Sequence, residues 1–137
     1  MPADPLELRP ITNPENLQND AIRNRARDGS KTSVTRHFVA IEGGVEVAFV
    51  ALDIIPAPED HLVLYELVVP KELRSRGIGS RILMEVERLA KEWKYVGVLI
   101  RPHPLDEHWT SNRLNRWYAT RGYKPRQDDS TIWTKPV

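Results

Sequence analysis

The fold is decided by the stretch LVVPKELRSRGIGS at residues 67–80. It begins in a nearly continuous apolar run, residues 61–69, which is typical of a central strand covered on both faces. A short basic loop follows, and Gly77 then opens the strongest helical pattern in the chain, residues 77–94. Several backbone N–H groups at this helix N-terminus therefore point at one spot beside arginines, an arrangement that favours a diphosphate.

Taken alone, this pattern has a second interpretation. An ordinary strand-to-helix turn with two solvated arginines contains the same residues, because a single G-x-G is a weak signal. A P-loop needs G-x-x-x-x-G-K-[ST], and a dinucleotide fold needs G-x-G-x-x-G with an acid about twenty residues on. The chain has neither motif at this turn, so the stretch indicates an anion site of another kind or no site.

The rest of the chain predicts strands and helices around this centre. Strands are expected at residues 6–11, 34–41, 45–55, 61–69, 95–100 and 131–135, and helices at 13–27, 77–94 and 111–121. Because strand, helix and strand follow one another within residues 61–100, the two strands should be parallel neighbours joined by a right-handed crossover. We therefore expect an α/β (α+β) fold with a single domain over residues 1–137.

Composition excludes several classes of protein. The 20 Lys and Arg residues against 19 Asp and Glu give a formal charge of +1, without the basic excess of a general nucleic-acid binder. Zero cysteine removes disulfides, thiolate nucleophiles and cysteine metal sites. No apolar run approaches the roughly 20 residues that span a bilayer, and the N-terminus lacks the pattern of a signal peptide. No membrane association is expected, and the expected location is cytoplasmic.

Residues 74–79, Arg74-Ser75-Arg76-Gly77-Ile78-Gly79, resemble motif A of the GNAT superfamily of acyl-CoA N-acyltransferases, [RQ]-x-x-G-x-[GA] after a central strand. Asn112 and the later Trp117-Tyr118-Ala119-Thr120-Arg121-Gly122-Tyr123 are similar to the family's Asn and its aromatic-Tyr-x-x-x-Gly-aromatic ending. The resemblance spans nearly the whole chain. It implies a mixed, mostly antiparallel central sheet of about six to seven strands flanked by helices, with splayed central strands that form a CoA cleft.

For the cofactor, the resemblance implies acetyl-CoA as cosubstrate and no metal. The backbone of Leu67, Val68 and Val69 would pair with the pantetheine arm like an extra strand. The diphosphate would lie on the amides of Ser75, Arg76, Gly77, Ile78, Gly79 and Ser80, with Arg74 and Arg76 adding charge. Asn112 is also assigned to the cofactor, although residues 101–111 separate it from the preceding strand, where many members have only a few residues.

The resemblance also implies the reaction. An acetyl group would pass from acetyl-CoA to a primary amine by direct attack in a ternary complex, since no cysteine is present to carry it. Tyr118 matches the family's general acid, although a core aromatic at that position is the alternative. Glu66 stands in an otherwise apolar strand, where a carboxylate must face the cleft or have a partner, and it is the first choice for the general base. His61 is the second.

Other features are left open by the sequence. A non-catalytic module that binds or senses acyl-CoA would keep the same fold and motif. The acceptor is a small-molecule amine or a peptide or protein amine. Residues 101–111 form either a stiff surface loop or an acceptor lid in which Asp106, Glu107 and Trp109 attract and cover a cationic amine. Trp133, expected to be exposed, is a candidate contact in a homodimer. A cluster of basic residues near the C-terminus is interpreted as a solvated face: Arg113, Arg116, Arg121, Lys124 and Arg126.

Overall fold

The computed structural model describes residues 5–29, 31–56, 60–103 and 110–137. Its centre is a seven-stranded mixed sheet in the order β1-β2-β3-β4-β5-β7-β6. The strands are β1 (Leu6–Pro10), β2 (Thr35–Glu42), β3 (Val45–Asp53), β4 (His61–Val68), β5 (Gly97–Ile100), β6 (Lys124–Pro125) and β7 (Trp133–Pro136). The helices are α1 (Asp20–Asp28), α2 (Ile78–Glu92) and α3 (Ser111–Ala119).

The strand pairing confirms the expected fold class. Neighbouring strands are antiparallel throughout the described sheet except β4 and β5, which are parallel and are connected through α2. The hairpin of β2 and β3 turns at Gly43 and Gly44, whose φ angles of 60° and 77° lie in the left-handed region that glycine adopts without strain. The strand, helix and strand predicted within residues 61–100 are therefore present as expected.

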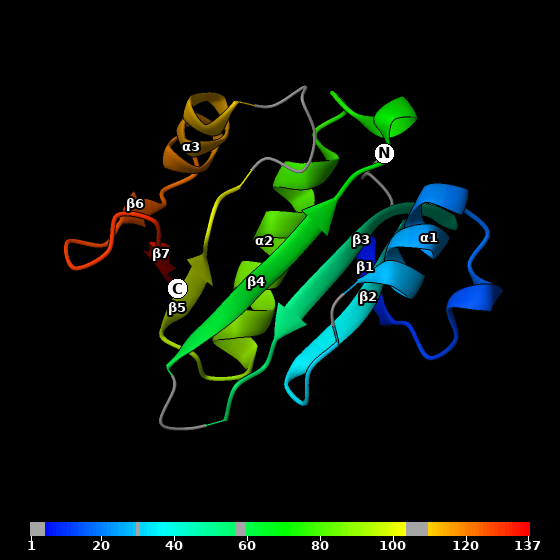
Figure 1. The fold of residues 1–137 in the computed structure, drawn as a ribbon, viewed down its shortest axis with the longest axis horizontal. Coiled ribbons are helices and arrows are strands. Elements are labelled where there is room, and N and C mark those ends of the chain that lie inside the picture. The colour runs from blue at the N-terminus through cyan, green and yellow to red at the C-terminus, as the bar shows by residue number, and fades with distance from the viewer. Residues whose placement is uncertain (1–4, 30, 57–59, 104–109) are drawn as a thin grey trace.

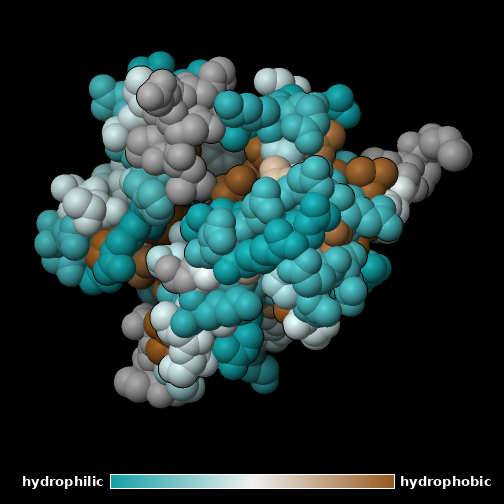
Figure 2. All heavy atoms as spheres, turned by 45° about the vertical axis from the view of Figure 1, so that its right-hand side comes forward, coloured by the Kyte–Doolittle hydropathy of each residue, from teal (hydrophilic) through white to brown (hydrophobic). Residues whose placement is uncertain are grey.

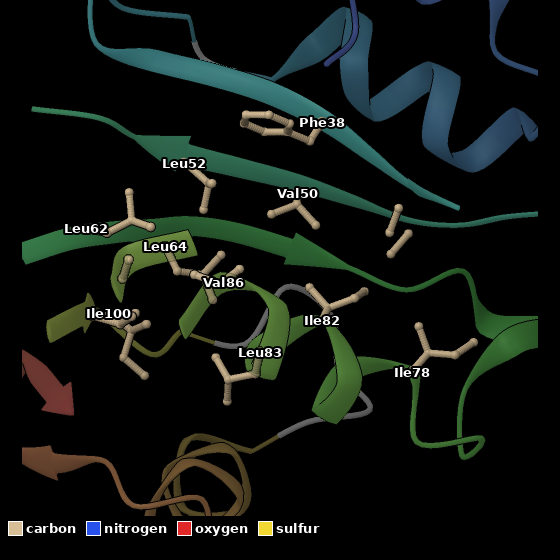
Figure 3. Packing of buried hydrophobic residues seen from close by; sticks show 14 of the residues in the cluster. Phe38, Val50, Leu52, Leu62, Leu64, Ile78, Ile82, Leu83, Val86 and Ile100 are labelled. Carbon is tan, nitrogen blue, oxygen red and sulfur yellow. The ribbon is translucent and has the colours of Figure 1, made fainter. Parts of the chain in front are cut away.

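The two faces of the sheet are covered by different helices. Figure 1 shows α1 in front of β2 and β3, and α2 behind β4. On the α1 side, Ile22 and Ala26 pack against Val39, Phe49 and Ala51 of the sheet. On the other side, the apolar stripe of α2 packs against side chains of the strands. Figure 3 shows residues of this cluster from α2 and from the strands: Phe38, Val50, Leu52, Leu62, Leu64, Ile78, Ile82, Leu83, Val86 and Ile100. This core fixes the end of β4 and the start of α2.

A β-bulge in β4 decides the direction of Glu66. Leu64 pairs with Leu52 and Glu66 pairs with Ala51, so Tyr65 is one residue too many for its partner strand. In a regular strand, Glu66 would share the face of Leu64, which lies in the α2 core. The extra residue instead puts Glu66 on the face covered by α1.

Some predicted element boundaries are wrong. The helix expected at residues 13–27 is a short 3-10 turn at Pro14–Asn16, capped by Asn13 as expected, followed by a separate α1. The break arises because the backbone N–H groups of Gln18 and Asn19 donate to the Glu46 carboxylate, at 2.9 and 2.7 Å, instead of to a preceding turn. The two-residue strand β6 was not predicted. Trp133, the candidate contact in a homodimer, is half-buried and packs against the core.

The face of the molecule drawn in Figure 2 is largely hydrophilic. In the face drawn in Figure 2, hydrophobic residues form scattered patches between hydrophilic ones. None of the helices in the part of the chain that the structure describes has the length and apolar character of a membrane span.

Candidate active site

A cavity opens where β4 and β5 separate. The two strands pair only from His61 with Gly97 to Leu64 with Ile100, and β4 then continues beside β3 alone over residues 65–68. Among the described strands, none pairs with this last part of β4 on its β5 side. The cavity at this place has a volume of about 650 Å³ and is lined by parts of α1, β4, the loop after it, α2, the segment after β5, and α3. The splayed strands expected from the sequence therefore enclose a ligand-sized space.

One end of the cavity is the first turn of α2. Ser75 and Gly77 have positive φ angles of 66° and 74°, and Gly77 is the N-cap of the helix. No side chain of the described residues caps this N-terminus, so its first amide groups point outward without an internal acceptor. The preceding Arg74 donates from Nε to the carbonyl of Val69 at 3.0 Å, which ties the loop to the end of β4. This arrangement suits an anionic group of a ligand.

A second wall of the cavity is α3, which presents Tyr118. Its ring is buried and lies edge-on to the rings of Trp117 and Tyr123, at centroid distances of 5.0 and 5.7 Å. Burial raises the pKa of the Tyr118 hydroxyl to about 12. The phenol therefore stays protonated at neutral pH and is available as a hydrogen-bond donor inside the cavity.

Trp117 and Arg121 extend this wall toward α2. The guanidinium carbon of Arg121 lies 3.8 Å from the centroid of the Trp117 ring. Its Nε and Nη2 donate to the Ser80 hydroxyl oxygen at 2.9 and 2.7 Å, and its Nη1 donates to the Trp117 carbonyl at 2.9 Å. Burial lowers the pKa of Arg121. A cation thus stands beside the first turn of α2.

The opposite wall holds an ion pair. Nε and Nη2 of Arg25 on α1 donate to the two carboxylate oxygens of Glu66 on β4, the second at 2.8 Å. The side chain of Glu66 is 6% exposed and that of Arg25 37%. The carboxylate raises the pKa of Arg25 chiefly through this hydrogen bond. Glu66 therefore lines the cavity with both of its oxygens already engaged.

Comparison with known families identifies this architecture. The family model described as "Acetyltransferase (GNAT) domain" matches residues 33–125. The chain belongs to the GNAT acetyltransferase family. The resemblance found in the sequence is thereby confirmed. No curated protein sequence matches the chain significantly.

Solved structures share the fold at low sequence identity. A GNAT acetyltransferase from Elizabethkingia anophelis, solved with acetyl-CoA bound, is 15% identical, with a TM-score of 0.68 over 98% of this chain and 99% of that one. An acetyltransferase from Thermus thermophilus is 16% identical, with a TM-score of 0.63 over the full length of both chains. The PaiA N-acetyltransferase from Thermoplasma acidophilum, solved with coenzyme A, is 18% identical, with a TM-score of 0.58 over 85% of this chain and 68% of that one.

The cavity of this GNAT acetyltransferase brings together most of the residues singled out in the sequence. Those that line it are Glu66, Leu67, Val68, Val69, Arg74, Ser75, Gly77, Ile78, Gly79, Ser80 and Tyr118. Arg76 and Asn112 are exposed and do not line it. His61 stands at the far end of β4, with Nδ1 2.7 Å from the Asp60 carboxylate, and is also outside the lining. The functional roles of all these residues remain predictions.

The sequence analysis missed two of the lining residues that matter most for charge. Arg121, interpreted as part of a solvated face, instead lies in the cavity wall, and that interpretation is wrong for this residue. Arg113 of the same cluster is exposed but also lines the cavity. The spacing of Arg121 was the available signal, because residues three and four positions after Tyr118 and Trp117 share a helix face with them. Arg25 gave no local signal, since its partner lies 41 positions away.

Two other predictions concern the segment after β5. Arg101, Pro102 and His103 line the cavity, whereas Asp106, Glu107 and Trp109 of the expected acceptor lid lie outside the described residues. Within the described ranges, no group of three or more His, Asp and Glu side chains is placed to hold a metal ion.

Proposed function

We propose that the protein transfers an acetyl group from acetyl-CoA to a primary amine by direct attack in a ternary complex. One observation carries the proposal: the one-sided end of β4, the uncapped N-terminus of α2 and the Tyr118 hydroxyl all border the same cavity. These groups suit, in that order, the extended pantetheine chain, the diphosphate and the leaving thiolate of acetyl-CoA. The family membership of the chain supports the same reaction.

The proposed position of the cofactor follows from these groups. The pantetheine arm lies along residues 65–68 of β4 and uses backbone hydrogen bonds, as an added strand does. Its diphosphate lies at the amides of residues 75–80, where the partial positive charge of the helix N-terminus favours an anion. This orientation would put the thioester near the bulge at Tyr65, in the cavity that Tyr118 also lines.

The chemistry then needs a proton donor and a proton acceptor. The amine attacks the thioester carbonyl, a C–N bond forms, and the C–S bond breaks to leave the CoA thiolate. We assign Tyr118 to donate a hydrogen bond or a proton to that sulfur, and to regain the proton from solvent. The nitrogen loses one proton, for which Glu66 is the one carboxylate among the described lining residues. That proton would go to an oxygen that already accepts a hydrogen bond from Arg25.

The proposal is tested by calorimetric titration with acetyl-CoA and with free CoA, followed by incubation with acetyl-CoA and a panel of peptides and polyamines. We expect near-stoichiometric binding at about micromolar affinity, and an acetylated amine detected by mass spectrometry together with free thiol. Absence of binding to a folded protein would refute the cofactor assignment. Binding without transfer to any amine in the panel would favour the alternative of a sensing module.

A further inference from the structure

Arg121 differs from several arginines of the structure in what it is paired with. Arg25, Arg27, Arg81 and Arg88 each form an ion pair with a carboxylate, which raises their pKa values. Arg121 is instead bonded to a serine hydroxyl and to uncharged oxygens, and its pKa is lowered by burial. Within the part of the chain that the structure describes, no carboxylate forms an ion pair with Arg121. Its positive charge is therefore left for a ligand.

The side chain is held in place before any ligand arrives. Three nitrogens of Arg121 donate hydrogen bonds, and the guanidinium stacks on Trp117. Trp117 is itself packed closely on α2, since a Cβ built at Gly79 would lie 3.3 Å from its ring. A cation with so little freedom loses little conformational entropy when it binds an anion.

Its partner, Ser80, lies in the first turn of α2. Because the Ser80 oxygen accepts from both Nε and Nη2, its own proton remains free to be donated elsewhere. The hydroxyl, the guanidinium and the first amides of α2 thus meet at one border of the cavity.

A second hollow begins on the other side of this border. It has a volume of about 420 Å³ and shares Ser80 and Arg121 with the main cavity. Glu87, the acidic residue in its lining, is paired with Lys135 at 3.0 Å and so does not oppose an anion strongly. Arg121 therefore stands between two spaces, which is the place expected of the middle of a long ligand rather than of its end.

We infer that Arg121 and the Ser80 hydroxyl together bind the diphosphate of acyl-CoA, with the adenosine continuing toward the second hollow. The inference rests on the proposed function, since it requires acyl-CoA in the cavity. A charge-assisted hydrogen bond of this kind stabilises a complex more than a neutral one does. The inference makes the turn directly after α3 a contact of the cofactor. Because Tyr118 lies near the end of α3, three residues before Arg121, binding would also help to fix the acid beside the sulfur.

The test compares three ligands: acetyl-CoA, its 3′-dephospho form, and S-acetylpantetheine, which lacks every phosphate. Arg121→Gln removes the charge, and Arg116→Gln is the matched control, because Arg116 lies five residues earlier on α3, is exposed and is outside the cavity lining. We expect Arg121→Gln to raise the Kd of both diphosphate ligands by the same factor, about 10- to 100-fold. The Kd of S-acetylpantetheine should not change. Arg116→Gln should change none of the three by more than about twofold.

Other outcomes overturn the inference in distinct ways. A loss confined to acetyl-CoA would move Arg121 to the 3′-phosphate, and an equal loss for all three ligands would make it a packing residue only. An unchanged Kd for acetyl-CoA would exclude a contact. Wild-type protein that binds none of the ligands would refute the proposed function itself, before any variant is made. If Arg121→Gln does not fold, Arg121→Lys keeps the charge without the planar fork and should raise Kd about 3- to 10-fold by the same pattern.

Discussion

The two walls of the cavity differ in how their charged side chains are paired. On the α1 wall, Arg25 and Glu66 neutralise each other within the chain. On the α3 wall, Arg121 is bonded to neutral groups, and no hydrogen bond of the Tyr118 hydroxyl to another described residue is recorded. Groups satisfied by the chain stabilise the fold, whereas groups left unsatisfied are available to a ligand. We therefore expect Arg25 to act mainly on stability, and Arg121 and Tyr118 on affinity and turnover. Glu66, as the proposed proton acceptor, should affect both stability and turnover.

The largest expected effect is on turnover, from Tyr118→Phe. The variant keeps the ring that packs on Trp117 and Tyr123 and removes only the hydroxyl. We expect kcat for acetyl transfer to fall about 100-fold, because a positioned proton donor contributes about that much. The Kd for acetyl-CoA should stay within about twofold, since the ring still fills its place. A variant with normal kcat would show that Tyr118 is a core aromatic and that the acid lies elsewhere.

The next effect is on stability, from Arg25→Met. Methionine keeps an apolar stem on α1 but leaves the Glu66 carboxylate, 6% exposed, without its partner. We expect the free energy of unfolding to fall by about 2 kcal/mol, less than for a fully buried pair because Arg25 is itself partly exposed. Denaturant unfolding measures this, and calorimetry should give an unchanged Kd for acetyl-CoA.

Arg27→Met is the control for this change on the same helix. Arg27 also pairs with a carboxylate, that of Glu15, but both side chains are well exposed, at 44% and 60%. Its loss should lower the free energy of unfolding much less than the loss of Arg25 does. If Arg25→Met weakened acetyl-CoA binding while leaving stability unchanged, the α1 wall would belong to the binding site and the comparison would fail.

The sequence predicted Tyr118 on the α3 wall and the glycine turn that starts α2, but not the ion pair of Arg25 and Glu66, and the reason is physical. The Tyr118 and Gly79 positions belong to short local patterns, in which spacing along one helix or turn decides which groups meet. The Arg25 to Glu66 contact depends on the bulge at Tyr65, which turns Glu66 to the other face of the sheet. One extra residue in a strand leaves no pattern that periodicity detects.

The helix ends also differ in how well the sequence predicted them. The boundaries of α2 were close to those expected, because a long apolar stripe and a glycine mark them within the helix itself. The break before α1 was not predicted, because it is made by Glu46, a residue of another strand. Contacts that are distant in sequence decided the features that the sequence analysis missed.

A smaller effect is expected at alkaline pH. The pKa of Tyr118 is about 12 in the folded protein and 10.0 when unperturbed. Below pH 10 both states are protonated, and between pH 10 and 12 the unfolded chain loses its proton first, which favours unfolding. Wild type should therefore lose about 1 kcal/mol more stability than Tyr118→Phe between pH 8 and pH 11. Parallel curves for the two proteins, from denaturant unfolding at each pH, would mean that the hydroxyl is open to solvent.

The smallest expected effect comes from Arg88→Ala on the solvent side of α2. Arg88 donates to two carboxylates, those of Glu85 and Glu92, and so makes more ion pairs than Arg25 does. Its side chain is nevertheless 58% exposed, so water replaces these bonds at little cost. The free energy of unfolding should therefore change little, by less than in any of the preceding variants. A loss of stability as large as that of Arg25→Met would mean that the number of ion pairs, and not the burial of the carboxylate, determines how much an arginine contributes to stability.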